Sequence, residues 1–191
     1  MQNDLSVFLK AMKFSAEKHR HQRRKDEQAS PYINHPIEVA NVLWTVGDVY
    51  DVTTIVAALL HDTIEDTNTT REEVLDNFGE EVLALVLEVS DDKSLSKQER
   101  KAGQIAKAPY LSLGAKQLKL ADKICNISDI ANFPPQDWSW QRRFDYLEWA
   151  EAVVAGLRGV NAKLETYFDE TLAEARKKLA LEKDFPAGVH S

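Results

Sequence analysis

Two segments of the chain place metal-binding side chains directly after an apolar helical run. His61 and Asp62 follow the apolar residues 57–60, and Asp122 follows the largely apolar residues 118–121. An imidazole or a carboxylate at a buried helix end needs a polar partner, because burying such a group unpaired costs free energy. A divalent metal ion would supply that partner, so the sequence predicts a metal site at these residues.

A second imidazole comes from His35, which lies directly before Pro36 at the start of a predicted helix. Imidazole and carboxylate ligands together suit divalent transition ions such as Mn²⁺, Fe²⁺, Co²⁺ and Zn²⁺. The chain has five histidines, and the remaining three offer no convincing ligands for a two-metal centre. We therefore expect one ion per chain, bound by His35, His61, Asp62 and Asp122.

An acidic pair follows the first two ligands at helical spacing. Glu65 lies four residues after His61, and Asp66 lies four residues after Asp62. If the helix continues through this turn, both carboxylates lie over the metal ligands. Carboxylates in that position can orient a water molecule and take up its proton, which is the general-base role that phosphoester hydrolysis requires. We predict that Glu65 and Asp66 are catalytic.

The chain carries a net charge of −7 but has a local basic cluster. Five of the residues between positions 18 and 25 are Lys or Arg. An acidic protein with one basic patch suits a small phosphorylated ligand, whereas nucleic-acid polymers select a broad basic face. Arg24 and Lys25 are therefore predicted to bind substrate phosphates, and no nucleic-acid polymer is expected as a partner.

Two further residues are predicted to contact the substrate. Asn126 lies one helical turn after Asp122, so it shares the metal face and could hydrogen-bond a sugar hydroxyl. Tyr146 lies in an aromatic-rich segment near the end of the chain. We assign Tyr146 to the pocket and expect the tryptophans around it to lie in the core or at an interface.

The elements that position these side chains are predicted to be helices. Helical periodicity dominates the sequence, and no segment shows sustained alternation of apolar and polar residues. Asp51 is a predicted N-cap, and Thr70 with Glu73 forms a capping-box pattern. We expect an all-α helical bundle in which residues 22–34 form a loop or a short β-hairpin. The predicted helices span residues 4–20, 36–47, 52–60, 71–79, 82–89, 96–107, 114–130, 136–156 and 158–181.

Length and composition indicate a single domain at residues 1–181, followed by a polar tail at residues 182–191. Cys125 is the only cysteine, so an internal disulfide is excluded and a reducing compartment is expected. The longest strongly apolar run, residues 55–60, is far shorter than the ~20 residues that a membrane-spanning helix needs. We expect a cytoplasmic protein with no membrane partner.

The chain resembles one family through five segments that occur in order: HRHQRRKD at residues 19–26, PYINHP at 31–36, AALLHDTIEDT at 57–67, DDK at 91–93 and KLADK at 119–123. They are similar to the stand-alone small alarmone hydrolases of the HD superfamily, of the metazoan SpoT homologue type, and to the hydrolase domain of RelA/SpoT enzymes. The resemblance implies an all-helical HD fold and a role in the stringent response. It also implies Mn²⁺-dependent hydrolysis of guanosine 3′,5′-bis(diphosphate), ppGpp, or its 5′-triphosphate relative, pppGpp, to pyrophosphate and GDP or GTP.

The same resemblance assigns roles to individual residues. His35, His61, Asp62 and Asp122 match the family's metal ligands. Glu65 and Asp66 match the pair that activates a water on the single ion for attack on the 3′-diphosphate. Arg24, Lys25, Asn126 and Tyr146 match positions that hold the nucleotide. Cys125 and Ser128 depart from the bulkier or more basic residues common there, which bears on the base and ribose contacts.

Three alternatives remain open from the sequence. NADPH presents a phosphate on a ribose carbon near a purine, so a 2′-phosphatase activity on NADPH would use the same site. Another nucleotide phosphohydrolase activity, such as that of a nucleoside 5′-monophosphate phosphatase, is a more distant option. A non-catalytic nucleotide sensor would be expected to lack at least one ligand or acidic residue, and all are present. The oligomeric state is left open.

Overall fold

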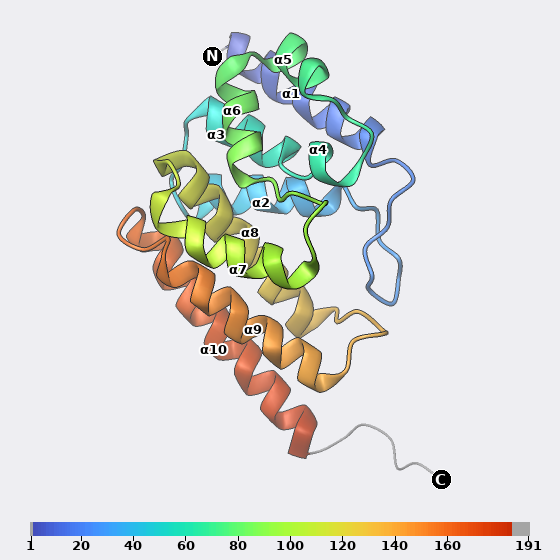
Figure 1. Ribbon diagram of the computed structural model, residues 1–191, viewed down its shortest axis with the longest axis vertical. Coiled ribbons are helices and arrows are strands. Elements are labelled where there is room, and N and C mark those ends of the chain that lie inside the picture. The colour runs from blue at the N-terminus through green and yellow to red at the C-terminus, as the bar shows by residue number, and fades with distance from the viewer. Residues whose placement is uncertain (1, 185–191) are drawn as a thin grey trace.

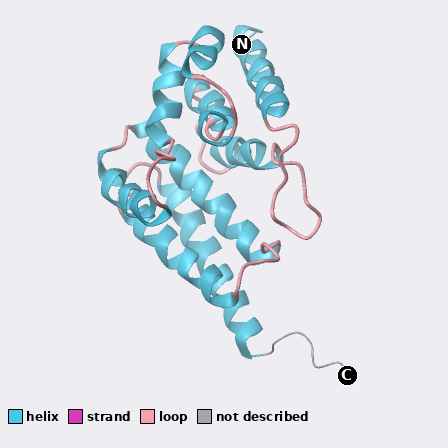
Figure 2. Ribbon diagram, turned by 45° about the vertical axis from the view of Figure 1, so that its right-hand side comes forward, coloured by secondary structure: helices cyan, strands magenta, loops and turns pink. Residues whose placement is uncertain are grey.

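The computed structural model of the chain describes residues 2–184, with side chains described for residues 4–183. These residues form helices joined by loops, and none of them forms a β-strand (Figures 1 and 2). The all-α prediction is confirmed. The helices are α1 (Gln2–Lys18), α2 (Asn34–Thr45), α3 (Val52–Leu60), α4 (Thr63–Asp66), α5 (Arg71–Phe78), α6 (Glu80–Val89), α7 (Lys97–Lys107), the short 3₁₀ helix η1 (Ala108–Tyr110), α8 (Leu113–Asn132), α9 (Trp140–Ala155) and α10 (Ala162–Asp184).

The segment between α1 and α2, predicted to be a loop or a short β-hairpin, is a loop that contains one isolated β-bridge. A single antiparallel β-bridge joins Arg23 and Pro31 at its base. At its tip, the Asp26 carboxylate accepts the backbone N–H of Ser30 (3.0 Å), and Ala29 adopts a positive φ of 48°. The segment is therefore an irregular loop closed at its base, which we call the α1–α2 loop (residues 19–33).

Local capping explains several of the predicted boundaries. Asp51 accepts the backbone N–H of Thr54 (2.8 Å) at the start of α3. Thr70 and Glu73 form both hydrogen bonds of a capping box at the start of α5, and Gly79 ends that helix with a positive φ of 85°. These side chains satisfy N–H groups that have no partner within the helix.

Two predicted helix starts are wrong by four residues. Helix α9 begins at Trp140 and not at residue 136, because Ser139 caps it by accepting the backbone N–H of Arg142 (3.2 Å). Helix α10 begins at Ala162 and not at residue 158, because Asn161 accepts the N–H of Leu164 (3.2 Å). Helix α10 also continues to residue 184, into the predicted polar tail, and residues 185–191 of that tail lie outside the described residues.

The apolar helix α3 lies at the centre of the fold. Its residues 56–60 have no exposed surface, and it packs against α1, α2, α6 and α8. A helix that is apolar on every side is stable only where neighbours surround it completely. Helix α8 continues the core from α3 toward α9 and α10, which extend along the far end of the molecule (Figure 1). The two central helices, α3 and α8, thus bring residues 60–62 close to residue 122.

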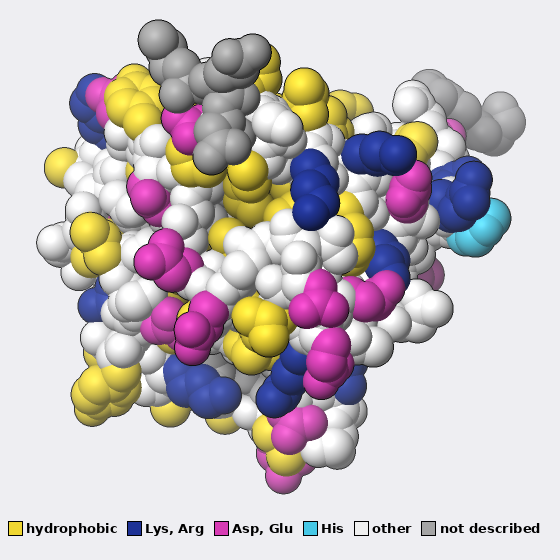
Figure 3. Space-filling view, turned by 90° about the horizontal axis from the view of Figure 1, so that it is seen from above, with side chains coloured by type: hydrophobic (Ala, Val, Ile, Leu, Met, Phe, Trp, Pro, Cys, Tyr) yellow, Lys and Arg dark blue, Asp and Glu magenta, His cyan; other side chains and the backbone are white. Residues whose placement is uncertain are grey.

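No helix in residues 2–184 combines the length and the apolar character needed to cross a membrane. A shallow apolar groove of about 570 Å³ lies between α1, α2 and α3 and is lined by Leu5, Phe8, Ile37, Trp44 and Tyr50, among others. Figure 3 shows a face of the molecule on which hydrophobic side chains lie among Asp and Glu side chains.

Candidate metal centre and active site

Three segments of the chain bring the predicted metal ligands close together. His35 lies in the first turn of α2, directly before Pro36, which is tolerated there because its missing N–H would have no helical partner. His61 and Asp62 link the end of α3 to the start of α4, and Asp122 lies in the middle of α8. Both histidines and Asp122 are buried, with exposed fractions of 4%, 5% and 6%.

The distances between the four side chains are those of a compact ligand set. His61 Nε2 lies 3.2 Å from Asp62 Oδ2, and His35 Nε2 lies 3.2 Å from Asp122 Oδ1. The two crossed His–Asp distances are both 3.9 Å. Adjacent ligands of an octahedral ion with bonds of ~2.1 Å lie about 3 Å apart. His35, His61 and Asp62 therefore form a cluster that can hold a metal ion, and Asp122 lies beside both histidines.

Hydrogen bonding prepares His61 as a metal ligand. Its Nδ1–H donates to the Ala58 carbonyl (2.7 Å), which fixes the tautomer and leaves the Nε2 lone pair facing the carboxylates. That Nε2 atom is buried and has no hydrogen-bond partner in the described protein. Because it faces two carboxylates, this atom needs either a proton or a metal ion between it and them. The donor set and this unpartnered atom both fit a divalent ion.

The pKa shifts in the cluster also indicate a site for a cation. Burial lowers the pKa of His61, but the charges of Asp62 and Asp122 outweigh it and raise that pKa to about 9. Burial raises the pKa of Asp62, yet His61 and His35 hold it well below its usual range. The protein without an ion would therefore hold a proton on His61 where a metal ion can bind.

Asp122 is fixed by two donors in addition to the histidines. Asn126 Nδ2 donates to Asp122 Oδ1 (2.6 Å), and Lys123 Nζ donates to Asp122 Oδ2 (2.9 Å). The Lys123 ammonium is buried and lies 4.7 Å from the centre of the Trp149 ring. Asn126 thus lies beside the metal ligands as the helical spacing predicted, while the contact from Lys123 was not anticipated from the sequence.

The acidic pair lies on the short helix α4. The backbone N–H of Asp66 donates to the Asp62 carbonyl (2.8 Å), so the helical turn continues through the pair as expected. Glu65 Oε2 accepts the backbone N–H of Asp91 (2.9 Å). Burial raises the pKa of Glu65. Lys93, in the loop after α6, forms an ion pair with Asp66 Oδ1 (2.5 Å) and lies 3.6 Å from Glu65 Oε1.

Tyr32 joins the acidic pair to the metal ligands. Its hydroxyl donates to Asp62 Oδ2 (2.7 Å) and lies 3.4 Å from Asp66 Oδ2. Burial, with Asp62 close by, raises the pKa of Tyr32 strongly, so its hydroxyl remains a donor. The ring of His19 stacks on Tyr32 with centroids 4.8 Å apart. Tyr32 lies in the PYINHP segment at residues 31–36, and the sequence alone assigned it no role.

Two adjoining cavities open beside this centre. The small cavity has a volume of about 310 Å³ and is lined by predicted site residues, Arg24, Lys25, Asp66, Asn126 and Tyr146 among them. The large cavity, of about 870 Å³, is lined by His35 and by several acidic residues, Asp26, Glu27, Glu38 and Glu182 among them. Arg24, Asp26, Asp129, Phe133, Pro135 and Trp138 line both cavities.

Arg24 lies at the boundary between the two cavities. Its guanidinium forms an ion pair with Asp129, which lies two helical turns after Asp122 on α8. The same guanidinium lies 5.7 Å from the centre of the Tyr32 ring. The predicted phosphate-binding arginine is therefore held by a carboxylate at the boundary of the two cavities.

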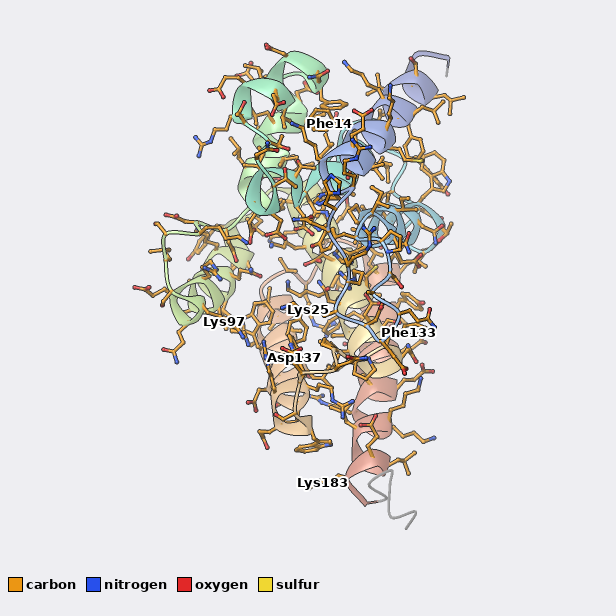
Figure 4. All side chains as sticks on the ribbon, turned by 90° about the vertical axis from the view of Figure 1, so that its right-hand side faces the viewer. Phe14, Lys25, Lys97, Phe133, Asp137 and Lys183 are labelled. Carbon is orange, nitrogen blue, oxygen red and sulfur yellow. The ribbon has the colours of Figure 1, made fainter. Side chains whose placement is uncertain are left out.

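The other predicted substrate residues differ in their exposure to solvent. Lys25 is exposed at the mouth of the small cavity, and Figure 4 shows it between Lys97 of α7 and Phe133 at the end of α8 in that view. Tyr146 packs edge-on against Trp149, with centroids 5.2 Å apart, and burial raises the pKa of Tyr146 to about 12. Trp138, which we expected in the core or at an interface, lines both cavities.

These elements define a class of protein. An all-α domain with His35 on α2, His-Asp at the end of α3 and a further Asp on α8 is the arrangement that the HD motif describes. The HD domain family model matches residues 11–145, and the chain belongs to this family. The predicted resemblance is confirmed at that level.

Particular relatives are more similar still. The chain is 50% identical over 169 residues to guanosine-3′,5′-bis(diphosphate) 3′-pyrophosphohydrolase MESH1 of Xenopus tropicalis, covering 88% of this chain and 94% of that protein. It is 50% identical over 165 residues to MESH1 of Homo sapiens, covering 86% and 92%. A solved structure of a metazoan ortholog of SpoT that hydrolyzes ppGpp and plays a role in starvation responses superposes with a TM-score of 0.86 at 46% identity, over 88% of this chain and 94% of that one.

Proposed function

We propose that the protein is a guanosine-3′,5′-bis(diphosphate) 3′-pyrophosphohydrolase, which converts ppGpp or pppGpp to GDP or GTP and pyrophosphate. One observation carries the proposal: His35, His61, Asp62 and Asp122 converge beside the Glu65–Asp66 pair, which adjoins a cavity lined by Arg24 and Lys25. Relatives that carry this name match the chain over more than nine-tenths of their own length. The similarity therefore includes the whole domain that holds the site.

The ligand set suits a single divalent transition ion, and we assign it to Mn²⁺. His35, His61, Asp62 and Asp122 would hold the ion through two nitrogens and carboxylate oxygens, a mixture that such ions accept. When bound, the ion supplies Lewis-acid activation of water and of a phosphoryl oxygen. The protein contributes rigid placement, since Ala58, Asn126 and Lys123 fix the ligands by hydrogen bonds.

Glu65 and Asp66 accept and donate the protons that the reaction transfers. The oxygen of water forms a bond to the phosphorus attached to the ribose O3′, and the bond between that phosphorus and O3′ breaks. The acidic pair takes up one proton of the water and returns a proton to O3′, which leaves as a hydroxyl. Burial raises the pKa of Glu65, so its carboxylate is a stronger base than an exposed glutamate. Tyr32 and Lys93 hold Asp66 at fixed distances from Asp62 and Glu65.

Arg24, Lys25, Asn126 and Tyr146 bind the nucleotide in this proposal. All four line the small cavity, which also contains Asp66 of the acidic pair. Its volume of about 310 Å³ is at the lower end of the range for ligand pockets, so a substrate with two diphosphates must also enter the adjoining large cavity. The nucleotide would then replace Asp129 as a partner of the Arg24 guanidinium.

An assay of purified protein with Mn²⁺ against ppGpp and NADPH, with products separated by anion-exchange chromatography, tests the function. GDP and pyrophosphate should appear from ppGpp with the unmodified protein and not with His61→Ala. The NADPH rate ranks the competing substrate, which offers a ribose phosphate beside a purine. Failure of metal-replete protein to release pyrophosphate from ppGpp would overturn the proposal.

A further inference from the structure

Lys93 lies where the predicted function needs positive charge and where no role has been assigned. It belongs to the loop between α6 and α7, residues 90–96, and its ammonium contacts both members of the acidic pair, Asp66 at 2.5 Å and Glu65 at 3.6 Å. The backbone of the same loop binds Glu65 through the Asp91 N–H (2.9 Å). Gln104 of α7 in turn donates to the Asp91 side chain (2.7 Å), so the loop is anchored beside the site.

The charges around the reaction centre explain why this ammonium matters. Asp122 is paired with the buried Lys123, and the remaining charge of Asp62 and Asp122 faces the position of a divalent ion. Glu65 and Asp66 add two more negative charges at the place where the substrate's own anionic diphosphate must arrive. Like charges at such distances repel strongly in a partly buried site. Among the described residues, Lys93 is the cation in contact with this acidic pair.

The exposure of Lys93 suits a residue that changes partners. Its side chain is 51% exposed, whereas that of Glu65 is 19% exposed. Partial burial lowers the pKa of Lys93, but Asp66 and Glu65 outweigh that effect and raise it, so the ammonium is charged at neutral pH. A flexible lysine with three donors can bind a carboxylate and a phosphate oxygen together.

Lys93 also approaches from a different element than the predicted nucleotide-binding cations. Arg24 and Lys25 come from the α1–α2 loop and line the small cavity, while Lys93 comes from the loop after α6 and lies outside that lining. Arg24 and Lys25 are the predicted phosphate contacts on the small-cavity side of Asp66. Lys93 contacts Asp66 from outside that lining, so its ammonium can reach a diphosphate that lies beside the acidic pair.

We propose that Lys93 binds the distal phosphate of the 3′-diphosphate and thereby stabilises the departing pyrophosphate. The inference rests on the proposed function, because it requires the diphosphate to lie beside Glu65 and Asp66. In the free protein, the ammonium neutralises the acidic pair. In the complex, the Lys93 ammonium contacts both the acidic pair and the phosphate oxygens while the bond to O3′ breaks. The ammonium keeps its protons when pyrophosphate leaves.

Product inhibition measured on Lys93→Ala, Lys93→Arg and the matched control Lys107→Ala, an exposed lysine at the end of α7, tests this contact. With free Mn²⁺ held constant, we expect Lys93→Ala to raise the inhibition constant of pyrophosphate about 10-fold or more, the size of a lost charge-assisted hydrogen bond. The inhibition constant of GDP should change less than about 2-fold, because GDP lacks the 3′-diphosphate. Lys93→Arg should restore most of the pyrophosphate affinity, and Lys107→Ala should match the unmodified protein.

An unchanged inhibition constant for pyrophosphate in Lys93→Ala, even with reduced turnover, would overturn the proposal and leave Lys93 as a support for the acidic pair. Direct titration of pyrophosphate into the Mn²⁺-loaded protein gives the same comparison without turnover. The hydrolysis assay and the titration together separate the two hypotheses. Absence of ppGpp hydrolysis by the unmodified protein would refute the proposed function. Equal pyrophosphate binding by Lys93→Ala and the unmodified protein would refute the role of Lys93.

Discussion

The predicted metal ligands and the predicted nucleotide-binding residues are held in opposite ways. His35, His61 and Asp122 are buried and lie on or at the ends of helices, and hydrogen bonds from neighbouring groups orient His61 and Asp122. Arg24 and Lys25 lie on the α1–α2 loop, which is closed by a single β-bridge and contains a residue with positive φ. In the proposed function, helices would therefore position the ion and the acidic pair, while a surface loop would position the nucleotide. The two regions meet at Tyr32, which lies in the same loop and donates a hydrogen bond to Asp62.

Removal of Asp122 should have the largest effect. We expect Asp122→Ala to abolish measurable metal binding and to reduce turnover by more than about 10³-fold, because ligand loss removes the source of water activation. Metal content after purification and kcat for ppGpp measure the two effects. Asp76→Ala, an exposed aspartate on α5, serves as the control. Retention of a full equivalent of metal by Asp122→Ala would exclude Asp122 as a ligand.

Removal of the Glu65 carboxylate alone should leave the metal site intact. Glu65→Gln keeps the volume of the side chain and is expected to lower kcat by about 10²- to 10⁴-fold, the usual contribution of a general base. Its metal content should equal that of the unmodified protein, since the Glu65 carboxylate contacts the Asp91 N–H and Lys93 and no metal ligand in the described structure. Loss of metal in this variant would instead place Glu65 among the ligands.

Change in the loop should affect substrate binding more than the chemical step. Arg24→Ala is expected to raise KM for ppGpp by about 10- to 100-fold, as expected for a lost charge-assisted contact with phosphate. Its metal content and thermal midpoint should remain close to those of the unmodified protein, because Arg24 lies outside the core. A large loss of metal in Arg24→Ala would contradict the separation between the two regions.

The smallest effect, with the opposite sign, is expected for the partner of Arg24. Asp129→Asn removes the charge that competes with phosphate for the guanidinium, and it should lower KM by about 2- to 5-fold, which corresponds to the ~0.5–1 kcal/mol typical of a partly exposed ion pair. Steady-state kinetics at several salt concentrations measure it, and the gain should shrink as salt rises. A higher KM in Asp129→Asn would show that Asp129 orients Arg24 for the substrate.

The sequence was sufficient for the metal cluster but not for its surroundings. His61, Asp62 and Asp122 follow apolar helical runs, so their convergence follows from packing α3 against α8, which buries His61 and Asp122. Tyr32 and Lys93 contact the acidic pair from loops whose paths depend on the tertiary structure, and no helical spacing relates them to residues 65 and 66.

The wrong helix starts have a local cause. In both cases a capping side chain, Ser139 or Asn161, begins the helix a turn later than the helix-forming residues before it suggested. Capping competes with propensity at such positions, and the sequence pattern alone does not decide between them.

The burial of α3 has a consequence for how the metal ligands can be released. Residues 56–60 have no exposed surface, and His61 follows them directly. Local fluctuations that expose loops cannot free this imidazole without displacing the helix, which is central to the core. The backbone amides of residues 57–60 should therefore exchange hydrogen for deuterium only through global unfolding, and they should be among the slowest in the protein.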